Sequence, residues 1–131
     1  MGVITTHDRA DLPACPVETC LLLIGNKWKV LILRDLMAGP LRFTALRNAV
    51  GGVTQKVLTA NLRSMEEDGL IWRKAYAQVP PRVEYGLTDL GRSLAPVLDS
   101  LSSWGSRYQE LSRHADPAED LSAGAAALGG A

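Results

Sequence analysis

The spacing of apolar and polar residues from position 53 to position 91 predicts one helix followed by two short strands. The helical part, which we call the reading helix, repeats apolar residues on one stripe, at Leu58, Leu62 and Met65. Thr54 is suited to cap its start, and Asp68-Gly69 is a typical stop signal. The runs 70–76 and 82–87 then have the pattern of strands, joined by a segment with two prolines. Helix, strand, stiff tip and strand, in this order, are typical of a winged helix-turn-helix.

The polar face of the reading helix carries side chains that suit contacts with double-stranded DNA. For base edges we expect Gln55 and Thr59, because their side chains both donate and accept hydrogen bonds. For phosphates or guanine we expect Thr54, Lys56 and Arg63. The alternative is that these are ordinary solvated residues of a surface helix, where such side chains are common.

Three further cations flank the reading helix and are expected to hold phosphates of the DNA backbone. Arg42 lies just before the support helix that we expect at 44–50, while Lys74 and Arg82 belong to the two strands of the wing. The dipeptide Gly51-Gly52 supplies the tight turn between the support helix and the reading helix.

The rest of the chain predicts further helices before and after this motif. We expect helices over 15–25, 27–37 and 88–111, and a short strand at 41–43. The last helix carries an apolar stripe that is self-complementary and too apolar for a lone helix, which favours a homodimer. The stripe consists of Leu94, Leu98, Leu101 and Trp104.

The expected fold class is therefore mainly α with a small β-hairpin wing (α+β). It is a winged helix-turn-helix with extra N- and C-terminal helices that form a homodimer. The expected domains are an N-terminal arm (1–14), the winged helix-turn-helix domain (15–112) and a disordered Ala/Gly-rich tail (113–131). Within the domain, the helices 15–25 and 88–112 are expected to mediate dimerisation.

The formal net charge of zero hides an uneven distribution of charge. Residues 26–92 hold eleven Lys or Arg against six Asp or Glu, whereas the segments 1–25 and 93–131 are each net acidic. A basic middle suits contact with phosphates. The chain shows no secretion signal, no membrane span and only two cysteines, so we expect a cytoplasmic protein without a membrane partner.

The sequence gives little indication of an enzyme or of a metal-binding protein. His7 and His114 are isolated, so no ligand pair has zinc spacing, and we expect no metal or cofactor. No nucleophile has a base nearby in the sequence, so we expect no enzyme.

Six segments together resemble one protein family. They are Cys15-Pro-Val-Glu, Ile24-Gly-Asn-Lys-Trp-Lys, Gly39-Pro-Leu-Arg-Phe, Thr54-Gln-Lys-Val-Leu-Thr, Leu62-Arg-Ser-Met-Glu-Glu-Asp-Gly-Leu and Val79-Pro-Pro-Arg-Val-Glu-Tyr-Gly-Leu-Thr-Asp-Leu-Gly-Arg-Ser-Leu. In this order, over 15–105, they are similar to the HxlR-type winged helix regulators of bacteria and archaea. The resemblance implies a homodimeric transcription factor that binds an inverted-repeat operator near its own or a neighbouring gene, with a dimer built from the first and last helices.

Cys15 is the expected candidate for redox sensing. It directly precedes Pro16 at a helix start, where free backbone N–H groups and the helix dipole favour a thiolate. The resemblance implies the role, because family members with a cysteine at this place include thiol sensors of oxidants and electrophiles. The alternative is a small apolar residue packed at the dimer seam. Cys20 lies in the apolar run of the same helix and is expected in the core.

Two other functions stay open at this level. A winged helix can serve protein contact alone, and a regulator of this kind can respond to a small-molecule ligand instead of a thiol. The effector is therefore unknown from the sequence. We expect repression, because a dimer bound at a promoter blocks polymerase without further contacts.

Overall fold

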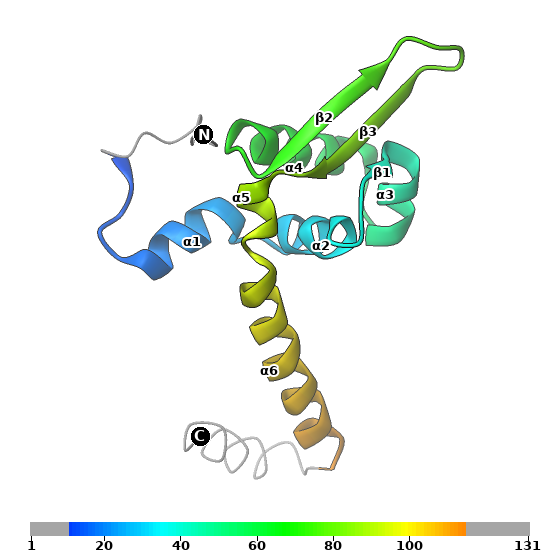
Figure 1. The fold of residues 1–131 in the computed structure, drawn as a ribbon. Helices are drawn as coiled ribbons and strands as arrows, with labels where there is room; N and C mark the ends of the chain where they lie inside the picture. The colour runs from blue at the N-terminus through cyan, green and yellow to red at the C-terminus, as the bar shows by residue number, and fades with distance from the viewer. Residues whose placement is uncertain (1–10, 115–131) are drawn as a thin grey trace. The chain divides into compact units, whose positions relative to one another are not determined.

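The computed structural model of the protein describes residues 11–114. Most of the expected N-terminal arm and the expected disordered tail from 115 onward therefore lie outside the described residues. The chain falls into two compact units that divide between Ala95 and Pro96. The elements (Figure 1) are α1 (Pro16–Ile24), α2 (Lys27–Leu36), β1 (Leu41–Arg42), α3 (Phe43–Val50), α4 (Gln55–Glu67), β2 (Ile71–Tyr76), β3 (Arg82–Leu87), α5 (Asp89–Arg92) and α6 (Ala95–Arg113).

The core of the first unit confirms the apolar stripe predicted for the reading helix, which is α4. The apolar side chains with at most 1% of their surface exposed come from α2, α3 and α4: Ile32, Leu33, Leu36, Leu46, Leu58, Leu62 and Met65. Full burial of one such side chain is worth about 1.5–3 kcal/mol. Because the apolar stripe of α4 is buried in the core, the opposite face of the helix is the one exposed to solvent.

The two ends of α4 are set by the expected cap and stop signals. The Thr54 hydroxyl oxygen accepts a hydrogen bond from the backbone N–H of Val57 at 3.1 Å, which satisfies one of the free donors of the first turn. After Glu67 the chain passes Asp68 and turns at Gly69, whose φ of 79° is in the left-handed region. The preceding turn uses Gly51 in the same region, with φ at 75°.

The sheet has the strand order β1-β3-β2, with both pairs antiparallel. Ile71 pairs with Leu87 at the base of the hairpin, and the pairing runs out to Tyr76 opposite Arg82 near its tip. Because successive strand residues point to opposite faces, the buried residues Ile71, Tyr85 and Leu87 define an inner face. The fold class expected from the sequence is confirmed: helices dominate, and the hairpin forms a wing (Figure 1).

The prediction of one continuous helix over 88–111 was wrong. The structure has the short helix α5, a turn at Ser93 and Leu94, and then α6. Pro96 explains the break, because proline has no N–H to donate to the carbonyl of Arg92 one turn earlier, so α5 cannot continue through it with regular helical hydrogen bonds. The N–H of Leu94 instead bonds the carbonyl of Gly91, three residues back, at 3.1 Å. None of the helices within 11–114 is long and apolar enough to cross a bilayer.

Candidate nucleic-acid interface

The outer face of α4 carries polar and basic side chains on one open surface. Gln55, Lys56, Thr59 and Arg63, all four singled out in the sequence, are exposed there and flank Ala60. Thr54 is exposed too, but its hydroxyl oxygen caps α4. That hydroxyl keeps its proton for a phosphate oxygen, so capping and phosphate contact are compatible.

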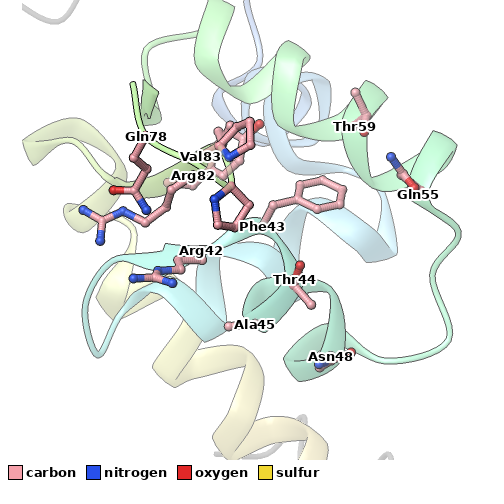
Figure 2. A pocket seen from close by; sticks show the side chains of 13 residues that line it. Arg42, Phe43, Thr44, Ala45, Asn48, Gln55, Thr59, Gln78, Arg82 and Val83 are labelled. Atoms are coloured by element: carbon pink, nitrogen blue, oxygen red, sulfur yellow. The ribbon is translucent and has the colours of Figure 1, made fainter. Parts of the chain in front are cut away.

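A groove of about 690 Å³ lies between α3, α4 and the tip of the hairpin. Figure 2 shows Arg42, Gln78 and Arg82 at one side of it, and Gln55 and Thr59 of α4 at the other. Phe43 and Tyr85 line the groove with ring centroids 6.4 Å apart. The groove thus joins the polar face of α4 to the wing, with cations along one side and aromatic rings in its lining.

The three flanking cations share one face of the sheet, which we call the outer face of the wing. Arg42 pairs across β1 and β3 with Glu84, and Lys74 pairs with Glu84 from β2. Arg82 pairs with Tyr76 two positions further along the hairpin. Since directly paired residues point to the same side, all five side chains project from the face opposite the core.

Sequence reasoning missed four further polar residues at this surface. Thr44 and Asn48 of α3 and Gln78 of the hairpin tip line the groove. Arg73 lies on the inner face of the sheet, where it lines a hollow together with Arg63. A polar α3 surface and the Arg73-Lys74 pair were visible in the sequence, but their side of the molecule depends on how the elements pack.

Two hydrogen bonds tie α4 to the start of α2. The amide nitrogen of Asn26 donates to the side-chain oxygen of Asn61 at 3.0 Å, and Lys29 Nζ donates to Ser64 Oγ at 2.9 Å. Arg47 of α3 adds a bond from its Nε to the carbonyl of Val53 at 3.2 Å. The first two bonds join α4 to the start of α2, the third joins α3 to the turn before α4, and none of them uses the outer face of α4.

Cys15 is exposed at the N-cap position of α1, with Pro16 in the first turn. Its thiol makes no capping bond to the helix. Cys20 is half-buried rather than fully in the core, and both thiols are free. Within residues 11–114 no group of three His, Cys, Asp or Glu side chains could hold a metal ion.

Apolar side chains are exposed on α1 and on α6, each considered within its own unit. On α6 they recur at helical spacing, at Val97, Leu101, Trp104 and Tyr108. Trp104 and Tyr108 stack with ring centroids 5.4 Å apart. Of the four expected interface residues, Leu101 and Trp104 are thus exposed, whereas Leu94 and Leu98 are half-buried. On α1 the exposed apolar residues are Val17, Leu21 and Leu22.

Comparison with known proteins gives a consistent result. Residues 23–113 match the HxlR-like helix-turn-helix family. The chain is 47% identical over 110 residues to YdeP of Bacillus subtilis (strain 168), an uncharacterized HTH-type transcriptional regulator, covering 84% of each chain.

Two solved structures are similar over most of their length. The HTH-type transcriptional regulator ytcD shares 46% identity at a TM-score of 0.69, over 73% of this chain and 98% of that one. The redox regulator HypR in its oxidized form shares 43% identity at a TM-score of 0.66, over 70% of this chain and 95% of that one.

Proposed function

Because the chain belongs to the HxlR-like helix-turn-helix family of DNA-binding transcriptional regulators, we propose that it represses transcription as a homodimer bound to an inverted-repeat operator. The relatives are named as transcriptional regulators, not as enzymes. The observation that carries the proposal is the polar face of α4, which continues through the groove to the basic outer face of the wing.

The proposed binding mode follows from the placement of these elements. α4 enters the major groove with Gln55 and Thr59 toward base edges, while Lys56 and Arg63 reach phosphates or guanine. Thr54 at the start of the helix contacts a phosphate. The wing lies along the backbone, where Arg42, Lys74 and Arg82 bind phosphates next to the site read by α4.

The homodimer is supported by the exposed apolar stripe of α6 and by the exposed apolar residues of α1. A two-fold dimer presents two copies of α4, so its operator has two inverted half-sites about one helical turn apart, or a multiple of that distance. A dimer bound in this way across a promoter excludes polymerase, which gives repression.

Arg63→Ala is expected to weaken binding to a duplex from upstream of the protein's own gene by roughly tenfold to a hundredfold. The reason is the loss of an exposed cation from the outer face of α4. Fluorescence anisotropy at several salt concentrations measures the affinity. If Arg63 contacts a phosphate, its loss reduces the magnitude of the slope of log K against log salt by about 0.9.

The matched control for Arg63→Ala is Arg34→Ala. Arg34 is an exposed arginine of α2 that pairs with the adjacent Asp35 at 2.8 Å and does not line the interface. This control is expected to bind like the unaltered protein. Equal affinity of both variants for the duplex contradicts the proposed role of α4.

We further propose that Cys15 regulates binding by forming a disulfide across the dimer or an adduct with an electrophile. Its exposed thiol at the start of α1 supports this role, as does the similarity to a chain named as a redox regulator. In a disulfide, two Cys15 thiols lose two protons and two electrons to an oxidant such as diamide.

Diamide is accordingly expected to weaken duplex binding by at least about fivefold, the lower range of allosteric couplings. Cys15→Ser abolishes this response, whereas Cys20→Ser, which removes the half-buried thiol of the same helix, keeps it. Non-reducing gels show whether a linked dimer forms. Unchanged binding of the unaltered protein after oxidation favours control by a small-molecule ligand instead.

A further inference from the structure

The outer face of the wing holds a cluster built around one aromatic ring, that of Tyr76. Lys74 Nζ lies 5.0 Å from the centroid of this ring, and the guanidinium carbon of Arg82 lies 3.8 Å from it. Both cations are thus within the range of an attractive cation–π contact with the same ring. Tyr76 is half-buried, so the contact is partly shielded from water.

Arg82 combines this ring contact with a buried nitrogen. Its Nε is buried, and among the described residues it has no hydrogen-bond partner. A guanidinium can pack with its face against an aromatic ring while its N–H groups point outward in the guanidinium plane, so a contact of this kind uses none of its donors. Within 11–114 the guanidinium contacts the ring of Tyr76 and forms no hydrogen bond or ion pair, so its terminal nitrogens keep their donors for a ligand.

The tyrosine hydroxyl also contacts a carboxylate on this face, that of Glu84. It donates a hydrogen bond to Glu84 Oε1 at 3.1 Å. Glu84 is paired across the sheet with both Arg42 and Lys74, yet within the described part of the chain it forms an ion pair with neither. Among the described residues, the outer face of the wing therefore carries three cations against one carboxylate, and that carboxylate holds none of the three in an ion pair.

We propose that Tyr76 is a positioning residue of the wing, holding Lys74 and Arg82 in place for adjacent phosphates of duplex DNA. This inference rests on the proposed function and explains how the wing would hold its cations ready to bind phosphates. Long cationic side chains lose rotamer freedom when they bind, and a ring that already restrains two of them lowers this cost. The groove beside Arg82 leads from the wing toward Gln55 and Thr59 of α4 (Figure 2).

The test compares Tyr76→Leu and Tyr76→Phe on two fluorescent duplexes from upstream of the gene. One duplex extends beyond the segment protected by the protein, and the other is trimmed so that the wing meets no phosphates. Tyr76→Leu is expected to weaken binding to the long duplex about tenfold. It is also expected to reduce the magnitude of the slope of log K against log salt by about 0.9–1.8, since one or two phosphate contacts are lost. Tyr76→Phe keeps the ring and is expected to bind within about threefold of the unaltered protein.

A double-mutant cycle separates positioning from general damage to the hairpin. When Lys74 and Arg82 are both replaced by Ala, adding Tyr76→Leu is expected to change affinity by less than about twofold, because the ring then has nothing to position. Val79→Ala is the control within the wing, since Val79 is 97% exposed near the tip.

An equal loss on both duplexes, full additivity in the cycle, or an unchanged salt slope for Tyr76→Leu overturns the inference. If Arg63→Ala weakens binding but Tyr76→Leu does not, the inference alone fails. If the unaltered protein binds neither duplex nor any other upstream fragment, the proposed function fails and the inference fails with it.

Discussion

Trp104→Glu is expected to convert the protein to a monomer and to lower its affinity for a palindromic duplex by about a hundredfold or more. Trp104 lies at the centre of the apolar stripe of α6 with 55% of its surface exposed, stacked on Tyr108. A carboxylate there is hydrated in the monomer and desolvated at a dimer seam, which strongly favours the monomer. A monomer loses the gain in local concentration that a second half-site provides.

Sedimentation velocity and anisotropy measure the two effects of Trp104→Glu. Ser106→Glu is the matched control, because it adds the same charge to an exposed position on the opposite side of α6. It is expected to stay dimeric and to bind normally. A dimeric Trp104→Glu protein with unaltered affinity contradicts the assignment of α6 to the interface.

The second large effect is expected in stability. Leu62→Ala should lower the free energy of unfolding by about 2–5 kcal/mol, since Leu62 is 1% exposed on the inner side of α4, which packs against α2 and β2. Urea titration followed by circular dichroism measures it. Val57→Ala, an apolar truncation in the same helix at a residue with 37% of its surface exposed, is expected to cost clearly less. Similar losses for both variants contradict the orientation of α4.

Strong local signals made the central motif predictable. The stripe of α4, the Thr54 cap and the alternation of the hairpin each follow from the residues themselves, and the structure shows them as expected. The break before α6 was missed because the apolar period runs on across Ser93 and Leu94. Pro96 is compatible with the first turn of a helix, so it marks a new start as readily as an interruption.

The candidate interface was predictable only where one element carries it. The outer residues of α4 follow from its own periodicity, and α4 presents them together. Asn48 and Gln78 come from separate elements and meet only when the sheet and α3 pack against α4. Arg73 and Lys74 are adjacent in β2, so their side chains point to opposite faces of the wing. Which of the two lies on the inner face depends on how the sheet packs.

The bonds from the start of α2 to Asn61 and Ser64 have a consequence for the evolution of the proposed operator preference. The residues that anchor α4 and the residues that face outward are separate sets, since Gln55, Lys56, Thr59 and Arg63 take no part in the tethers or the core. Substitutions at these four positions can therefore accumulate without loosening the scaffold. Under the proposed binding mode, grafting the four residues onto a relative such as ytcD is expected to transfer operator preference to that regulator.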